Sequence, residues 1–177
     1  MRVPAILSMC AVIVVAGCTT SAGQNPVRTL AAAPVIAAAG TAAGTISLQQ
    51  GSADALALHI ALRGLPPGLH GIHLHTVGRC DGPAFTTAGG HLNPGQHQHG
   101  TDNPAGSHLG DMPNLTVAPD GTVSADLAIA ANRQALEASL FDADGTAVVI
   151  HASADDYKTD PSGNSGARIA CGVFQRP

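Results

Sequence analysis

The sequence has few charged residues and no basic run. Only 11% of the 177 residues are charged, and the formal net charge is −4 at pH 7 with histidine neutral. Proteins that bind nucleic acid need clustered lysine and arginine to contact phosphates, so this composition argues against nucleic acid as a partner. Internal repeats are absent as well. A chain of this length fits one domain and can bury a core without metals or crosslinks.

Aromatic residues are equally scarce, at 2%, whereas glycine (21) and proline (12) are plentiful. This composition favours many turns over long helices. Residues 55–62 alternate strictly, with Leu56, Leu58, Ile60 and Leu62 on one face and His59 on the solvent side. Further strands are expected at residues 70–75, 115–117, 123–129, 147–151 and 168–174, and partial helix at 132–141. Short strands between glycine and proline turns predict an all-β sandwich or barrel.

The N-terminal segment reads as an export signal. Arg2 precedes an apolar run at residues 11–15 that is too short to span a bilayer. The sequence Val15-Ala16-Gly17-Cys18 resembles a bacterial lipobox, which predicts a signal peptide at residues 1–17 and a lipid on Cys18. An ordinary signal peptide cut elsewhere is the alternative. The protein would face the periplasm, and Thr19 favours the outer membrane in a Gram-negative cell. Residues 18–43 are expected to form a flexible linker, and residues 44–177 the domain.

The four cysteines follow from this prediction of export. Cys10 lies in the removed segment and Cys18 carries lipid, which leaves Cys80 and Cys171 in an oxidising compartment. A disulfide between them is the default expectation, and free thiols are the alternative. The bond would close a loop of about 90 residues, worth roughly 4–5 kcal/mol in the chain-entropy model.

Histidines are clustered at spacings typical of a metal site. Alternation along residues 70–75 places His73 and His75 on one face, while His70 shares the core face and is expected to be a structural residue bonded to backbone. His151 also points away from the core of its strand. Imidazoles two residues apart on a strand can converge on one ion.

A second group of metal-ligand side chains lies in residues 89–111, which lack any strand or helix pattern. This stretch contains His91, His97, His99, His108 and Asp111. A loop of this length needs something to order it, and imidazoles and a carboxylate gathered on zinc would do so. A solvated polar loop with incidental histidines is the alternative. Together the two groups suggest two ions, with zinc and copper as the ions that such ligands prefer.

Four motifs follow one another along residues 44–175. They are Gly71-Ile72-His73-Leu74-His75, Ala88-Gly89-Gly90-His91-Leu92-Asn93-Pro94, His108-Leu109-Gly110-Asp111, and the run from Gly163 to Val173. In their order and spacing they resemble copper/zinc superoxide dismutase. The resemblance implies a Greek-key, eight-stranded flattened barrel, that is, an immunoglobulin-like sandwich with long metal-binding loops.

The resemblance also implies one copper and one zinc per subunit, with His91 as an imidazolate shared by both. Its copper ligands are His73, His75, His91 and His151, and its zinc ligands are His91, His99, His108 and Asp111. His97 matches no ligand, although a register slip with His99 is an open alternative. Asp155 matches an aspartate that hydrogen-bonds one histidine of each set, and a solvated loop acid is its alternative. The pair Cys80 and Cys171 fits the family too.

The activity implied is the conversion of superoxide to O₂ and H₂O₂ by copper cycling between Cu(II) and Cu(I), while zinc orders the site. The chain is acidic and its substrate is an anion, so a local positive charge is needed, and Arg168 is the candidate. Two other hypotheses are a non-catalytic copper/zinc-binding lipoprotein that stores or delivers metal and a zinc-only hydrolase, for which no general-base motif is evident. Monomer and homodimer both remain open.

Overall fold

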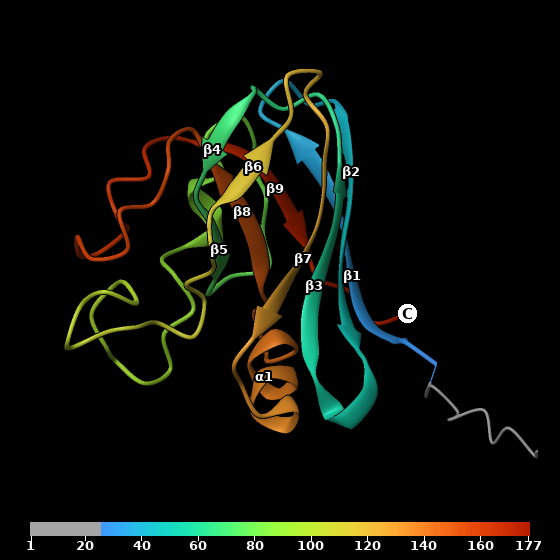
Figure 1. Cartoon of the computed structure of the whole chain (residues 1–177), viewed down its shortest axis with the longest axis vertical. Coiled ribbons are helices and arrows are strands. Elements are labelled where there is room, and N and C mark those ends of the chain that lie inside the picture. Colours follow the sequence, from blue (N-terminus) through green and yellow to red (C-terminus); the bar gives the residue numbers. More distant parts are fainter. Residues whose placement is uncertain (1–25) are drawn as a thin grey trace, which may run out of the picture.

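The structure, a computed structural model, describes residues 26–177, and it is built almost entirely of antiparallel strands (Figure 1). The main sheet runs in the order β5-β8-β9-β1-β2-β3-β7, and β4 and β6 form a second, two-stranded sheet. The predicted all-β fold is confirmed. The strands are β1 (Arg28–Ala37), β2 (Ala42–Gln50), β3 (Leu56–Leu62), β4 (Gly68–His70), β5 (Ile72–His75), β6 (Leu115–Val117), β7 (Val123–Ile129), β8 (Ala147–His151) and β9 (Arg168–Val173).

One hydrophobic core fills the inside of the curled sheet. The apolar face of β3, predicted from its alternation, is buried, as are Ile72 and Leu74 of β5 and Val148 and Ile150 of β8. The single α-helix of the described residues, α1 (Arg133–Leu140), lies at one end of the sheet (Figure 1) and adds Leu136 to the core. The prediction of helix near residues 132–141 is confirmed.

The expected linker is wrong over residues 28–43, because they form strand β1, the turn after it and the start of β2. Strand β1 pairs with β2 on one side and with β9 on the other. Two of its four buried side chains, Ala31 and Ala33, are small, and a bulge between Thr29 and Ala31 interrupts its alternation. Small residues and a bulge together conceal the two-residue period of a strand. The predicted signal peptide and Cys18 lie outside the described residues.

The strand expected at residues 70–75 is divided at Gly71. Its first part, β4, pairs with β6, and its second part, β5, pairs with β8. A Cβ atom on Gly71 would lie 3.0 Å from Cβ of Ser165 and 3.3 Å from Cε1 of His73, so any larger residue would crowd these side chains where the strand changes partner. Counted as one interrupted strand, β4 and β5 bring the nine strands of the described residues to the predicted eight.

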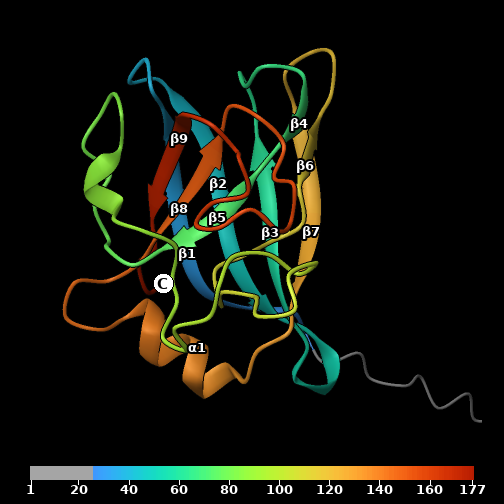
Figure 2. The ribbon, with the colours of Figure 1, turned by 90° about the vertical axis from the view of Figure 1, so that its left-hand side faces the viewer.

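Two long loops leave the sheet on the side of β5 and β8. Figure 2 shows the loop at residues 90–114 and the loop at residues 152–167 facing the viewer over these strands. The loops are joined directly, because the N–H of Asp102 donates to the carbonyl of Tyr157 at 2.9 Å. The sheet therefore presents both loops together on one face.

No helix within residues 26–177 has the length and apolarity needed to cross a membrane.

Candidate metal centre

Four buried imidazoles converge where β5 and β8 meet the first loop. His73 and His75 come from β5 and His151 from the end of β8, and His91 is held beside His75 by a short antiparallel bridge. One ring nitrogen from each lies within 4.8 Å of the others. The structure thus brings together the four residues expected as copper ligands.

Each of these imidazoles has one nitrogen bonded and one left free. Nδ1 of His75 lies 3.0 Å from the carbonyl oxygen of Gly89, and Nδ1 of His151 lies 3.2 Å from that of Gly166. The nitrogens without a partner in the structure are Nδ1 of His73 and Nε2 of His75, His91 and His151. Unpartnered buried polar atoms are rare in native proteins and require an explanation.

For three of the four imidazoles protons do not supply that explanation, because burial holds His75, His91 and His151 neutral. Desolvation lowers the pKa of His75 to about 2, that of His151 to about 3 and that of His91 to about 4. A neutral imidazole that donates its N–H to a carbonyl presents a lone pair at its other nitrogen. Several lone pairs that point at one another form a site for a cation that takes nitrogen ligands.

A second cluster is built around one carboxylate oxygen of Asp111. This Oδ1 atom lies 3.0 Å from Nδ1 of His91, 3.0 Å from Nδ1 of His99 and 3.1 Å from Nδ1 of His108. Its Oδ2 atom accepts the N–H groups of Gly100 and His108 at 2.9 and 3.0 Å. Burial alone would raise the pKa of Asp111, but these hydrogen bonds and the nearby imidazoles outweigh burial and hold it well below its usual range.

Proximity alone would also place His73 in this second cluster, since His73, His91, His99 and Asp111 each bring one ligand atom within 4.8 Å of the others. Both nitrogens of His73 are committed elsewhere, however, because Nδ1 belongs to the first cluster and Nε2 lies 2.7 Å from Asp155. We therefore count His108, which contacts Asp111 directly, as the fourth member. His91 contributes Nδ1 to this cluster and Nε2 to the first.

Asp155 contacts one histidine of each cluster, at the ring nitrogen that faces away from the other ligands. Its Oδ2 atom lies 2.7 Å from Nε2 of His73, and its Oδ1 atom lies 2.9 Å from Nε2 of His99. Asn114 fixes Asp155 by two hydrogen bonds to its backbone, at 2.8 and 2.9 Å. A Cβ atom on Gly163 would collide with the Asp155 carboxylate, so this position needs glycine. Sequence reasoning missed Asn114, and it named Gly163 only as the first residue of a family motif, without this role.

Arg168 lies beside the free nitrogens of the first cluster. It extends from β9 and, with His75, His91 and His151, lines one cleft at the surface. Its Nη1 donates to the carbonyl of Phe85 at 2.7 Å and its Nη2 to that of Gly89 at 2.6 Å. Desolvation lowers the pKa of this guanidinium, but arginine starts so high that it keeps its charge. The cleft can therefore receive a small anion.

The predicted disulfide between Cys80 and Cys171 is present. It links β9, which carries Arg168, to the loop whose carbonyl groups accept hydrogen bonds from the Arg168 guanidinium. Phe85, whose carbonyl accepts from Arg168, is fully buried against Cys171 and has a left-handed backbone with φ of 52°. A bulky residue adopts this conformation only where its surroundings demand it. The guanidinium is thus oriented by a rigid, crosslinked segment.

Comparison with known proteins identifies the family. Residues 42–174 match the family model of copper/zinc superoxide dismutase. The chain belongs to the copper/zinc superoxide dismutase family.

Individual relatives of this family agree with that match. A superoxide dismutase-like protein of Bacillus subtilis is 44% identical over 140 residues, which cover 76% of this chain and 70% of the relative. The copper/zinc superoxide dismutase of Caulobacter vibrioides is 38% identical over 149 residues, 82% of this chain and 85% of that protein. The crystallised copper/zinc superoxide dismutase of Brucella abortus has a TM-score of 0.65 at 28% identity, covering 81% of this chain and 98% of the other.

The residues present fit the two metals that this superoxide dismutase family takes. Four free imidazole nitrogens form a donor set suited to copper, and three imidazoles with one carboxylate suit zinc. Because His91 faces both sets, the geometry has the place for a shared imidazole.

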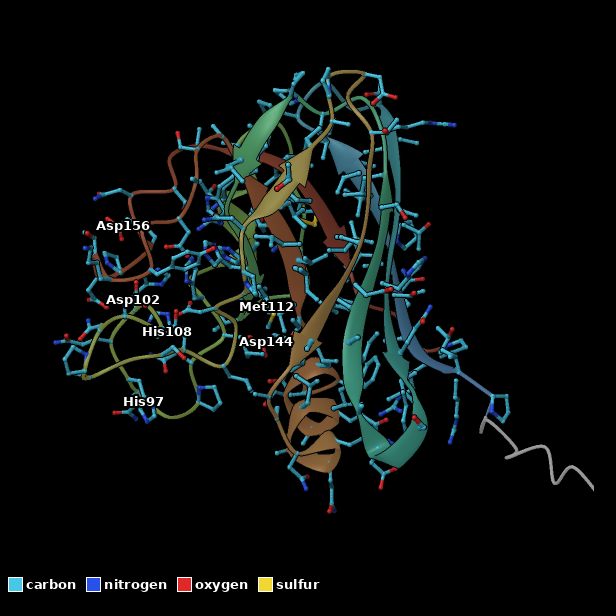
Figure 3. The ribbon with its side chains drawn as sticks, in the orientation of Figure 1. His97, Asp102, His108, Met112, Asp144 and Asp156 are labelled. Atoms are coloured by element: carbon cyan, nitrogen blue, oxygen red, sulfur yellow. A yellow bond between two sulfur atoms is a disulfide. The ribbon has the colours of Figure 1, made fainter. Side chains whose placement is uncertain are left out.

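The other histidines of this superoxide dismutase homologue behave differently. His97 is exposed on the outer part of the loop (Figure 3), with Nδ1 3.1 Å from the carbonyl of Ser107, so His99 rather than His97 meets Asp111. His70 is buried, and its ring nitrogens each lie 2.8 Å from a carbonyl oxygen, those of His151 and Pro66. Its expected structural role is confirmed. His59 lies 2.8 Å from Asp126 on the β3–β7 surface, away from both clusters.

Proposed function

We propose that this protein is a superoxide dismutase, which converts two superoxide anions and two protons into one O₂ and one H₂O₂. The observation that carries the proposal is the set of four buried imidazole nitrogens without partners, next to the fixed positive charge of Arg168. The chain's membership of the copper/zinc superoxide dismutase family supports it.

In this proposal His73, His75, His91 and His151 hold copper, and His91, His99, His108 and Asp111 hold zinc. Copper when bound supplies a one-electron couple between Cu(II) and Cu(I), while zinc keeps one oxidation state and orders the loop. Asp155 accepts from His73 and His99 and so fixes the tautomer and orientation of one ligand in each set.

Side chains of the protein bind the anion and deliver a proton. Arg168 attracts and orients the anion, since it is charged at every working pH and is held by two carbonyl oxygens. His91 can hold a proton at Nε2 and deliver it to the reduced oxygen, while its Nδ1 stays in the zinc set. The hydrophobic core behind β5 and β8 excludes water from that side of the imidazoles.

We further propose that the protein is exported and anchored through a lipid on Cys18 to a bacterial membrane, facing the periplasm. The outer membrane is the expected site if the cell is Gram-negative. The lipobox-like sequence before Cys18 supports this, and the disulfide between Cys80 and Cys171 is what an oxidising compartment favours. Labelling with radioactive palmitate, compared between the wild type and Cys18→Ala, tests the anchor.

The alternative is a non-catalytic protein that binds copper and zinc for storage or delivery. Arg168 argues against it, because a storage site has no need of a fixed cation in the same cleft as the metal ligands. The deciding experiment is pulse radiolysis of protein loaded with both metals, with copper and zinc content measured on the same sample. Second-order superoxide decay catalysed in proportion to bound copper is the expected result. Full metal loading without catalysis would leave the storage function instead.

A further inference from the structure

We propose that Tyr157 is a positioning residue for both metal sites, because it joins the two long loops and fixes the carboxylate of Asp155. The inference rests on the proposed function for the identity of the two ligand sets. Tyr157 is half-buried and contributes no atom to either cluster. Any effect that it has on a metal must therefore pass through Asp155.

The backbone of Tyr157 contacts both loops. Its N–H donates to Oδ1 of Asp155 at 2.7 Å, and the same oxygen lies 2.9 Å from Nε2 of His99. Its carbonyl accepts the N–H of Asp102, from the first loop, at 2.9 Å. Asp102 and Asp156, labelled in Figure 3, mark the two loops that are joined in this way. The Asp155 carboxylate is thus oriented by a neighbour that is itself bonded to the loop of the zinc ligands.

Tyr157 is held in a backbone conformation that a bulky residue rarely takes. Its φ of 63° lies in the left-handed region, which persists in such residues only where the surroundings impose it. Gly100 packs against its carbonyl so closely that a Cβ atom on Gly100 would collide with that group. Gly100 also donates its N–H to Oδ2 of Asp111, within the second cluster. The conformation of Tyr157 is therefore tied to the segment that builds the zinc site.

The side chain of Tyr157 completes a ring of hydrogen bonds around Asp155. Its Oη atom accepts the backbone N–H of Asn114 at 2.8 Å. Asn114 in turn donates from Nδ2 to the carbonyl of Asp155 at 2.9 Å and accepts the N–H of Asp155 at Oδ1, at 2.8 Å. The hydroxyl holds the residue that holds the backbone of Asp155, while the N–H of Tyr157 holds its carboxylate. Removing the hydroxyl leaves the N–H of Asn114 without this acceptor and loosens one side of the ring.

The expected size of the effect follows from the distance of Tyr157 from the metals. Loss of a direct outer partner of a metal ligand costs about 10–100-fold in metal affinity. Tyr157 acts one contact further out, and it keeps its N–H when the hydroxyl is removed. Because Asp155 contacts His73 in one cluster and His99 in the other, we expect a loss of about three- to ten-fold in the affinity for both copper and zinc.

The test uses Tyr157→Phe, which keeps the ring and removes only the hydroxyl. Tyr157→Met is a second variant without the hydroxyl, for use if the first folds poorly. Thr146→Val is the matched control, since it removes a fully buried hydroxyl that donates to the carbonyl of Ser139 at 3.0 Å, between α1 and β8 and outside both long loops. Copper and zinc affinities are measured by chelator competition on the whole protein, together with the Tm of the metal-free form.

Two further measurements separate positioning from a general loss of stability. Cobalt(II) loaded in place of zinc has a visible absorption spectrum that depends on the arrangement of its ligands, so it reports the orientation of His99. Tyr157→Phe is also combined with Asp155→Asn, because two residues that act through the same contact have effects that do not add.

The expected result is about three- to ten-fold weaker binding of both metals and an altered cobalt spectrum in Tyr157→Phe, with neither change in Thr146→Val even if its Tm falls. In the Asp155→Asn background, Tyr157→Phe should cost at most about two-fold more. Equal metal affinities in the wild type and Tyr157→Phe overturn the proposal, as do an equal loss in Thr146→Val or full additivity in the double variant. If the loaded wild type does not dismute superoxide, the proposed function fails while the metal affinities still decide the role of Tyr157.

Discussion

The two ligand clusters of this protein are supported in different ways. Of the first cluster, His73, His75 and His151 stand on β5 and β8, with the hydrophobic core directly behind them. Apart from His91, the second cluster lies on a loop without regular structure, and its members are held mainly by one another through Asp111. A sheet keeps its side chains in place whether or not an ion is bound. The loop depends on its own polar contacts, so it should gain more order from zinc than the strands gain from copper.

Acid should have the largest effect, through the buried imidazoles of the first cluster in the metal-free protein. Unfolded histidines titrate near pH 6.5, whereas the folded values are about 4 for His91, about 3 for His151 and about 2 for His75. Between pH 6.5 and pH 4 unfolding therefore takes up protons, and the free energy of unfolding falls as pH falls. Near pH 5 the uptake is about three protons, or about 1000-fold per pH unit in the unfolding equilibrium.

Urea denaturation of the metal-free protein at a series of pH values measures this slope. Asp111, whose pKa is lowered below its usual range, adds a loss in the same direction, but only at lower pH. A free energy of unfolding that stays constant from pH 6.5 to pH 5 would contradict the neutral, buried state of His75, His91 and His151.

The substitution His91→Ala should have the next largest effect, because it removes the residue that the clusters share. Loss of an outer partner of a metal ligand already costs about 10–100-fold, so loss of a ligand common to both sets should lower kcat/KM by at least about 100-fold. Pulse radiolysis with metal analysis measures it. His97→Ala is the matched control, and retention of activity in His91→Ala would exclude a shared ligand.

Asp155→Asn should weaken both clusters at once. The carboxylate accepts from His73 and His99 with separate oxygens, but an asparagine has one oxygen and one NH₂ group, so one imidazole loses its acceptor. We expect a loss of about 10–100-fold in the affinity for at least one metal, measured by chelator competition. Asp156→Asn is the control, since the neighbouring carboxylate bonds only within its own loop. Equal metal affinities in the wild type and Asp155→Asn would show that Asp155 orients nothing.

Zinc removal should loosen the loop and leave the strands unchanged. The N–H groups of Gly100 and His108 donate to Asp111, so their hydrogen exchange should accelerate by about 10-fold or more without zinc. The N–H groups of β8, paired within the sheet, should exchange at nearly the same rate. Equal acceleration in both places would mean that the clusters form one cooperative unit.

Arg168→Ala should have the smallest effect, a several-fold fall in kcat/KM with a weaker dependence on ionic strength. The substitution removes attraction for the anion and leaves both ligand sets intact. Arg63→Ala outside the cleft serves as the control for net charge. An unchanged rate and salt profile in Arg168→Ala would remove the arginine from the mechanism.

The sequence predicted the fold where alternation was clear and failed where it was not. Leucines of β3 repeat at every second position, but the alanines and bulge of β1 hide the same period, and β1 was mistaken for a linker. The outward direction of His73 and His151 followed from alternation alone. Alternation could not predict that the Asp155 carboxylate contacts His99, because the two residues are far apart in the chain and neither lies in a segment with a regular pattern. The resemblance to a known family supplied those residues, and only the coordinates reveal that Asn114 holds Asp155 in place.

The position of β1 would limit how far the enzyme could move from the lipid proposed on Cys18. If Cys18 carries lipid, only about nine residues separate it from the first paired residue, Arg28, instead of the 25 or so of a linker that reached the domain at residue 44. Fully extended, such a segment spans about 30 Å, less than the breadth of a small protein. The catalyst would then work in a thin layer next to the lipid surface, where it meets radicals released at the membrane before they diffuse into the surrounding compartment.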